Sequence, residues 1–145
     1  MESKVDTTIT LSQTLKANIE AVFNAWTTVE ALTKWFAPSD KFKTEVLELD
    51  VRKGGRYKIA MTDPDGKVHT AVGTYQTIER PTKLVFTWKW ESNEASETSL
   101  VTLSFRKQGD QTELTLFHAG LATEESAKHH QQGWTGCLER LVAMY

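Results

Sequence analysis

The spacing of apolar and polar residues changes along the chain and predicts its elements in order. Apolar and polar residues alternate from Thr7 to Thr14, which is typical of a half-buried strand. Asn18 then predicts the start of a helix, because its short polar side chain can cap the first turn. The apolar residues of this helix recur three and four positions apart and define one face: Ile19, Val22, Phe23 and Trp26.

A second short helix is predicted directly afterwards. Thr28 is its expected N-cap, and Pro38 is expected to end it. Its apolar face contains Leu32, Trp35 and Phe36. Two helices this short, joined without a real loop, predict one bent helical segment.

From Phe42 onwards the period changes to two, which predicts six consecutive strands before the last helix. Val46-Leu47 interrupts the alternation and predicts a bulge, and Gly73 predicts a bend or bulge in a long strand. Short turns between consecutive strands imply antiparallel pairing. The expected turns and loops are Gly54–Gly55, Asp63–Gly66, Arg80–Thr82, Ser92–Ser96 and Gly109–Asp110.

The last segment, Leu121–Tyr145, is predicted to form one long helix with Thr123 as its N-cap. Gly133 and Gly136 flank a tryptophan inside it, although a glycine within a helix costs about 1 kcal/mol relative to alanine. They indicate either a close approach of the backbone or space left open. The inner face combines a histidine and a thiol with apolar groups: His130, Trp134, Cys137, Leu138, Leu141, Val142 and Tyr145.

This order of elements predicts an α+β fold in which the long C-terminal helix covers the apolar face of an antiparallel sheet. The 145 residues are expected to form a single domain, 1–145, with a sizeable core. The 17 basic and 19 acidic residues form no basic block, which argues against nucleic acid as a partner. Met1–Thr8 lacks the apolar region of a signal peptide, and no apolar run is long enough to span a membrane. A cytoplasmic protein is therefore expected.

The residues of these elements resemble the SRPBCC (START-like, Bet v 1-like) superfamily, and most closely its branch similar to the C-terminal domain of the Hsp90 ATPase activator Aha1. Ile19 and Ala37 depart from the pattern, where proline and glycine are common. The residues that carry the resemblance run in order through most of the chain: Val22-Phe23, Ala25-Trp26-Thr27, Trp35-Phe36 with Pro38, Gly54-Gly55 with Tyr57, Gly73, Pro81 with Leu84, Thr87-Trp88, His118-Ala119-Gly120-Leu121, and Gly133-Trp134 with Leu138 and Leu141.

The resemblance implies a helix-grip fold: a seven-stranded antiparallel sheet wrapped around the long C-terminal helix, with two short helices after the first strand. It also implies a hydrophobic cavity for a small ligand between sheet and helix, and the chaperone-related branch implies a role in the stress response. Large aromatic residues and the inner face of the helix are the expected wall of that cavity. The predicted ligand-binding residues are Trp35, Tyr57, Met61, Trp88, Trp90, His118, His130, Trp134 and Cys137.

Two histidines are the candidates for chemistry in this space. His118 ends the inner face of the last strand, and His130 lies on the helix one turn before Trp134. Either they orient a ligand or transfer a proton, or hydrogen bonds to neighbouring groups hold each ring and fix the connection from strand to helix. The sequence leaves both interpretations open.

Other chemistry is not predicted. Glu125 and His129 have the spacing of two metal ligands, but His69 is expected to be remote on a strand, so no metal site is predicted. Cys137 is expected to be a small core residue, and as the only cysteine it excludes an intramolecular disulfide. The chain shows no phosphate loop, nucleophile elbow, zinc spacing or dinucleotide fingerprint, so no cofactor is predicted.

Three functions remain in order of preference. The first is binding of a small hydrophobic or amphipathic ligand in a cavity of roughly 300 Å³ or more. The second is a protein-interaction module related to Hsp90 ATPase activators, with a chaperone as partner. The third is a cyclase- or dehydratase-type enzyme that uses His118 or His130. The protein is expected to be a monomer or a homodimer, with a sheet edge or the basic turn from Arg52 to Lys58 as the contact surface.

Overall fold

The computed structural model of the chain describes residues 7–91 and 98–145. The first six residues and all of Ser92–Ser96 lie outside the described residues, so the loop expected there stays a prediction. The elements, in order, are β1 (Thr7–Leu15), α1 (Ile19–Thr27), α2 (Val29–Trp35), β2 (Lys43–Leu49), β3 (Arg56–Thr62), β4 (Val68–Glu79), β5 (Lys83–Trp90), β6 (Ser99–Gln108), β7 (Gln111–Leu121) and α3 (Glu124–Ala143).

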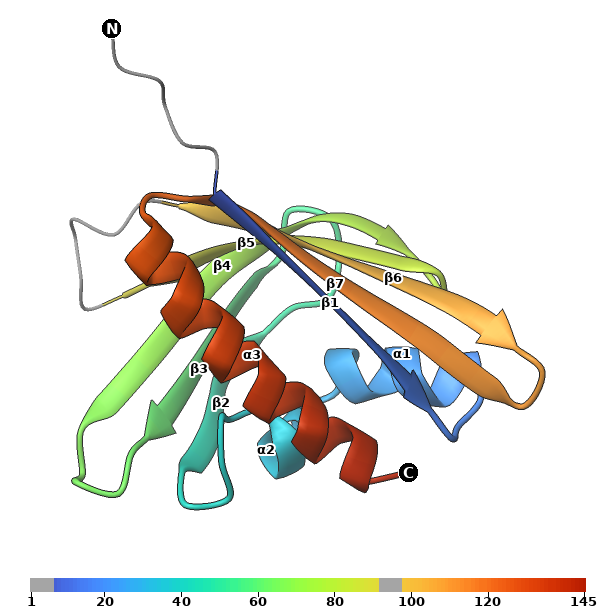
Figure 1. Ribbon diagram of the computed structural model, residues 1–145, viewed down its shortest axis with the longest axis horizontal. Helices are drawn as coiled ribbons and strands as arrows, with labels where there is room; N and C mark the ends of the chain where they lie inside the picture. Colours follow the sequence, from blue (N-terminus) through green and yellow to red (C-terminus); the bar gives the residue numbers. More distant parts are fainter. Residues whose placement is uncertain (1–6, 92–97) are drawn as a thin grey trace, which may run out of the picture.

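The strands form one seven-stranded antiparallel sheet in the order β1-β7-β6-β5-β4-β3-β2 (Figure 1). Six neighbouring strands follow one another in the sequence, and β1 closes the order by pairing with β7. The two short helices follow the first strand, and the long helix follows the last. The predicted α+β helix-grip architecture is therefore confirmed.

The three predicted N-caps hold the helix starts. The Asn18 side chain accepts a hydrogen bond from the backbone N–H of Ala21 at 2.8 Å. Thr28 begins α2 in the same way, and Thr123 Oγ1 accepts from the N–H of Ser126 at 3.0 Å. Each cap satisfies a backbone donor that the first turn of a helix leaves without a partner.

The register of the sheet shifts at three places, in the pairs β1–β7, β2–β3 and β4–β5, and only the shift in β2–β3 was predicted. The register shift between Val46 and Glu48 confirms the predicted bulge in β2. In β4 the shift lies between Tyr75 and Thr77, so the expectation of a bulge at Gly73 was wrong. Gly73 is instead needed because the Tyr57 side chain lies against it; a Cβ there would overlap the tyrosine ring and the carbonyl oxygen of Thr87.

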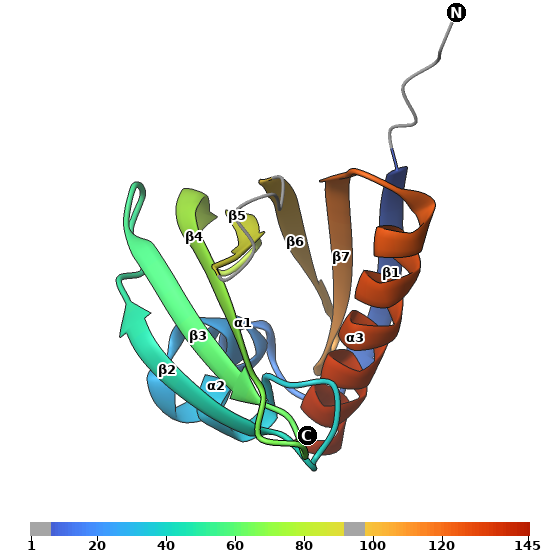
Figure 2. The same ribbon diagram turned by 90° about the vertical axis from the view of Figure 1, so that its left-hand side faces the viewer.

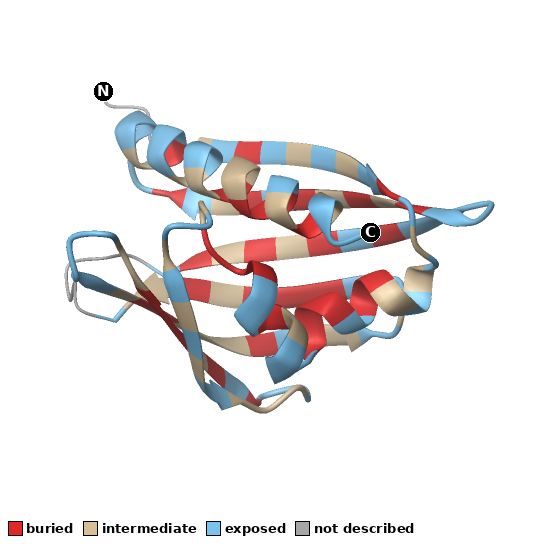
Figure 3. Ribbon diagram, turned by 90° about the horizontal axis from the view of Figure 1, so that it is seen from below, coloured by how far each residue is buried: buried red, intermediate tan, exposed pale blue. Residues whose placement is uncertain are grey.

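The helices cover the concave face of the sheet unevenly. Figure 2 shows α3 beside β1 and β7, with β2 and β3 on the opposite side, and α1 and α2 across the lower end. In Figure 3 the buried positions gather on α1, α2 and the strands, whereas much of α3 is exposed. Of the first ten residues of α3 only Ala127 is buried; the other buried residues of this helix are Trp134, Cys137, Leu138 and Leu141. Among the described residues, no helix is both long and apolar enough to cross a membrane.

Candidate functional site

The two glycines of α3 face different surroundings. A Cβ at Gly136 would collide with the carbonyl oxygen of Pro38, so this glycine lets the helix approach the segment after α2. A Cβ at Gly133 would meet no atom within 4 Å. The sequence left a close approach and open space as alternatives. The structure shows the close approach at Gly136 and the open space at Gly133.

The open space at Gly133 belongs to a pocket of about 220 Å³ beneath the first half of α3. This volume is smaller than the expected 300 Å³ and lies below the usual range of ligand sites. The walls come from the segment between α2 and β2, from β3, β4 and β5, and from α3 itself. The lining residues are Phe36, Pro38, Phe42, Met61, His69, Trp88, Trp90, His129, His130, Gly133 and Trp134.

The pocket brings together some of the predicted ligand-binding residues. Five of them line it: Met61, Trp88, Trp90, His130 and Trp134. Their aromatic rings contact one another; the ring centroids of Trp88 and Trp90 are 5.3 Å apart, and those of Trp88 and Trp134 are 5.1 Å apart. That any of these residues binds a ligand stays a prediction.

The other four predicted residues do not line this pocket. Trp35 is fully buried, and its indole N–H donates to the carbonyl of Ala25 at 2.9 Å. The Tyr57 hydroxyl donates to the carbonyl of Thr87 at 2.6 Å, and burial raises the tyrosine pKa well above its usual value. Cys137 is buried too, which raises the pKa of its thiol to about 12 and leaves it protonated at neutral pH.

His118, the fourth of these residues, is fully buried in β7 with hydrogen bonds at both ring nitrogens. The indole N–H of Trp134 donates to His118 Nδ1 at 3.1 Å, so Nδ1 carries no proton. The proton is therefore on Nε2, which donates to Ser99 Oγ at 2.6 Å. Burial, and next the neighbouring His130, lower the pKa of His118 to about 3, so the ring is neutral at physiological pH.

His130 repeats this arrangement on α3. The indole N–H of Trp88 donates to His130 Nε2 at 3.2 Å, and His130 Nδ1 therefore donates to the carbonyl oxygen of Ser126 at 2.9 Å. Burial lowers the pKa of His130. The rings of the two histidines lie 5.0 Å apart at an angle of 74°.

Paired indole and imidazole groups thus hold each other in one arrangement. Because an indole can only donate, protonation of either histidine would set two donors against each other. Within the described part of the chain, neither histidine keeps a ring nitrogen without a partner. The geometry favours the interpretation that hydrogen bonds fix the strand-to-helix connection, and it offers little support for proton transfer by His118 or His130.

His69 was expected on a strand, away from Glu125 and His129, and was not predicted as a residue of the pocket. It pairs with Met61 across β3 and β4, and both side chains line the pocket. The register of this hairpin could have placed it, since Asp63–Gly66 was correctly predicted as the turn and directly opposite residues share a face. The remaining lining residues that were not in the predicted set come from the segment between α2 and β2 or from α3: Phe36, Pro38, Phe42, His129 and Gly133.

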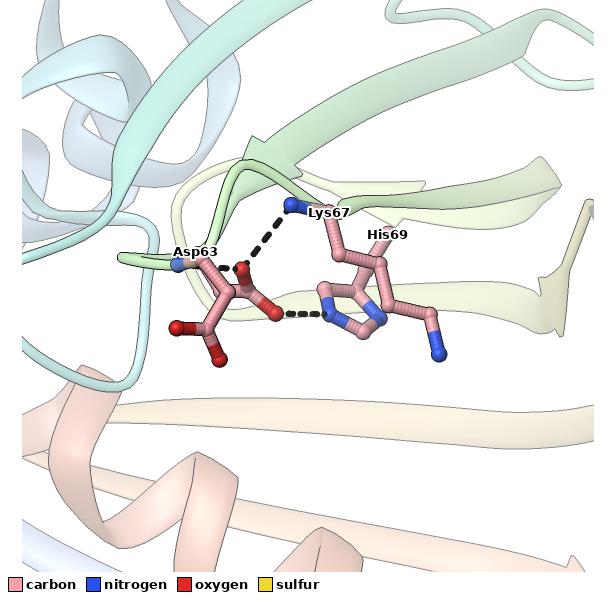
Figure 4. A network of polar contacts seen from close by, with 4 residues as sticks. Asp63, Lys67 and His69 are labelled. Atoms are coloured by element: carbon pink, nitrogen blue, oxygen red, sulfur yellow. Dashed lines mark hydrogen bonds and ion pairs between the residues drawn. The ribbon is translucent and has the colours of Figure 1, made fainter.

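A carboxylate holds His69 at the end of this hairpin (Figure 4). Asp63 Oδ1 accepts from the backbone N–H groups of Asp65 and Lys67, both at 2.9 Å. Asp63 Oδ2 lies 3.0 Å from His69 Nε2. The His69 hydrogen bond, followed by that from Lys67, lowers the pKa of the Asp63 carboxyl group, so it is ionised at neutral pH. In residues 7–91 and 98–145 no three histidine, cysteine or acidic side chains form a cluster that would hold a metal ion.

The fold and this site can be compared with known proteins. Residues 16–145 match the model of the family described as "Activator of Hsp90 ATPase homolog 1-like protein", AHSA1. The chain belongs to the AHSA1 family. The match covers every element from α1 to α3 and therefore includes all the residues that line the pocket. A comparison with curated proteins gave no match.

Solved structures share the fold of this AHSA1 domain. Protein CV1439 of Chromobacterium violaceum is 26% identical, with 94% of this chain and 95% of that chain covered and a TM-score of 0.87. The AHSA1 protein of Silicibacter pomeroyi is 24% identical, with 95% and 96% covered and a TM-score of 0.82. CalU16 of Micromonospora echinospora is 26% identical, with 94% and 74% covered and a TM-score of 0.71.

Proposed function

We propose that this AHSA1-family protein binds a small, largely apolar ligand in the pocket beneath the first half of α3. One observation carries the proposal: the helix has a glycine, Gly133, at the position where a side chain would meet empty space in an aromatic pocket. A helix-interior glycine costs about 1 kcal/mol relative to alanine. At Gly136 the close approach of Pro38 explains that cost, whereas at Gly133 no packing contact explains it.

The polar atoms of the inner wall also support an apolar ligand. The indole N–H groups of Trp88 and Trp134 donate to His130 and His118. Both nitrogens of His130 are engaged as well. A ligand that reaches this wall therefore finds carbon surface and ring faces, and a polar group buried there would lose its hydrogen bonds to water without replacement.

Titration with naphthalene tests the proposal, with isothermal titration calorimetry as the readout and native mass spectrometry to detect any co-purified ligand. Gly133→Leu should abolish naphthalene binding while the fold keeps at least its original stability, because leucine fills the pocket and favours the helix. Gln132→Leu is the matched control, since Gln132 is exposed and does not line the pocket. Absence of naphthalene binding to the original protein, or equal binding by Gly133→Leu, would contradict the proposal.

A second candidate is an interaction with an Hsp90-type chaperone, which the family match favours. The charge of the basic turn from Arg52 to Lys58, expected as a homodimer contact, is partly neutralised: Arg52 pairs with Asp50 at 2.9 Å, and Lys58 pairs with Glu91 at 2.8 Å. Adding the protein at saturating concentration to the chaperone and measuring ATP hydrolysis tests this function. An unchanged rate would exclude activation.

A further inference from the structure

We propose that Asp63 and His69 form the polar anchor of the pocket and select a compact aromatic ligand that carries one hydroxyl group. The hydroxyl would donate its hydrogen bond to His69 Nδ1, and the aromatic ring would occupy the apolar pocket. This inference rests on the proposed function, because it specifies the ligand class of the same pocket.

The position of the pair in the hairpin supports this assignment. His69 lies opposite Met61, and Ala71, two residues further along β4, lies opposite Trp90. These side chains share the concave face of the sheet, and the rings of His69 and Trp90 are 6.4 Å apart. The His69 side chain keeps 38% of its surface exposed, so it lies at the edge of the pocket and not in its inner wall.

The carboxylate fixes which ring nitrogen of His69 carries the proton. Asp63 is ionised and can only accept, so in the neutral form of the His69 ring the hydrogen is on Nε2. Nδ1 is then an acceptor, and it has no hydrogen-bond partner among the described residues. Asp63 is itself held by two backbone N–H groups of the turn, so the orientation of the pair is set before any ligand arrives.

The other polar groups around the pocket do not offer an equivalent acceptor. Both ring nitrogens of His130 and the indole N–H groups of Trp88 and Trp134 are used within the protein. His129 is exposed on α3 and has no carboxylate that fixes its tautomer among the described residues. A hydroxyl donor at the pocket edge therefore suits His69, while the ring of the ligand meets the faces of Trp88, Trp90 and Trp134.

Two ligands that differ in one hydrogen-bond donor test the proposal. The affinities of 2-naphthol and 2-methoxynaphthalene are measured by calorimetry at pH 8. For each protein we take the ratio of its affinity for 2-naphthol to its affinity for 2-methoxynaphthalene. This ratio should be about three to ten times larger in the original protein than in His69→Phe, as expected for one hydrogen bond. Comparing ratios between proteins cancels the different hydration of the two ligands.

The variant Asp63→Asn tests whether the position of the proton on the His69 ring determines the preference. The asparagine oxygen still accepts from the two turn N–H groups, but its amide N–H would donate to His69 Nε2 and move the ring proton to Nδ1. This variant should therefore lose the preference for 2-naphthol while it still binds 2-methoxynaphthalene. Gln132→Leu, which changes an exposed residue of α3 that does not line the pocket, should keep the preference.

The outcomes separate this inference from the proposed function. Equal ratios for the original protein, His69→Phe and Asp63→Asn would overturn the anchor and leave an apolar pocket that binds both ligands. Loss of the preference in Gln132→Leu would also overturn it. If neither ligand nor naphthalene binds the original protein, the pocket is not a site for such ligands and both proposals fail.

Discussion

The two halves of α3 contact the rest of the molecule in different ways. From Trp134 onwards the helix is packed: Leu138 and Leu141 are almost fully buried, and Gly136 brings the backbone against Pro38. Before Trp134 the helix overhangs a pocket and buries only Ala127. The comparison teaches that one amphipathic helix can stabilise the fold with one half while its other half covers an open pocket.

Trp134 lies at the boundary between these halves. Its ring lines the pocket, while its indole N–H donates to the fully buried His118. Its centroid is 6.1 Å from that of Trp26 on the packed side and 5.1 Å from that of Trp88 on the pocket side. The hydrogen-bonded indole and imidazole groups therefore hold the pocket wall in a fixed position relative to the core.

The largest expected effect on stability comes from comparing the loss of a tryptophan in the packed region with the loss of one in the pocket. Trp35→Ala should lower the free energy of unfolding by about 3–5 kcal/mol, because it removes a fully buried side chain. Trp90→Ala should cost less than half as much, since Trp90 is only half-buried and already borders empty space. Urea unfolding of both variants measures the difference. Equal losses would show that the pocket is as important to stability as the core.

The two glycines of α3 should respond to alanine with opposite signs. Gly136→Ala forces a Cβ against the Pro38 carbonyl and should destabilise the protein by about 1–3 kcal/mol. Gly133→Ala meets no neighbour and should stabilise it by up to about 1 kcal/mol, because alanine favours the helix. Thermal and denaturant unfolding would reveal the signs. A destabilising effect at position 133 would mean that the space there is not open.

Acid should lower the free energy of unfolding because His118, which is hydrogen-bonded to Trp134 at the boundary between the halves, is buried in its neutral form. Its pKa is about 3 in the folded protein and near 6.5 when unfolded, so the unfolded state binds the extra proton between these values. Stability should therefore be complete above pH 6.5 and fall by up to ~1.4 kcal/mol per pH unit below it. From pH 7 to pH 5 the loss from this group is roughly 2 kcal/mol.

Comparison with His118→Asn isolates this contribution. The slope of stability against pH between 7 and 5 should be shallower in the variant, whatever its absolute stability, because the group that takes up the proton on unfolding is gone. His130, whose pKa is also lowered, contributes a slope of the same sign in both proteins. An unchanged slope after the substitution would contradict the buried neutral His118.

Local sequence signals predicted the packed region well. The caps at Asn18, Thr28 and Thr123 and the alternation of the strands depend on neighbours close in sequence, and the structure confirms the caps and the order of the strands. The roles of the glycines could not be predicted, because Gly133 and Gly136 differ only in what faces them across the fold.

The pocket was harder to predict for the same reason. Its inner wall follows from strand alternation, which placed Met61, Trp88 and Trp90 on one face. Phe36 and Phe42 were assigned to the ends of the second helix and the following strand, but they lie in the segment between α2 and β2 and reach the pocket from there. His69 could have been placed from the hairpin register, but its partner Asp63 required the geometry of the turn.

The smallest expected effect concerns how each helix start is held. Asn18→Ala should lower global stability by about 1 kcal/mol, because α1 buries Val22 and Phe23 within its first turns and cannot loosen without disturbing the core. Thr123→Ala removes an equivalent cap from the weakly packed half of α3, where the helix can fray alone. Native-state hydrogen exchange should therefore show faster exchange at Ala127 and Lys128, with global stability lowered by no more than about 0.5 kcal/mol. A global loss as large as that of Asn18→Ala would mean that the first half of α3 unfolds only together with the core, and the distinction between the two halves would not hold.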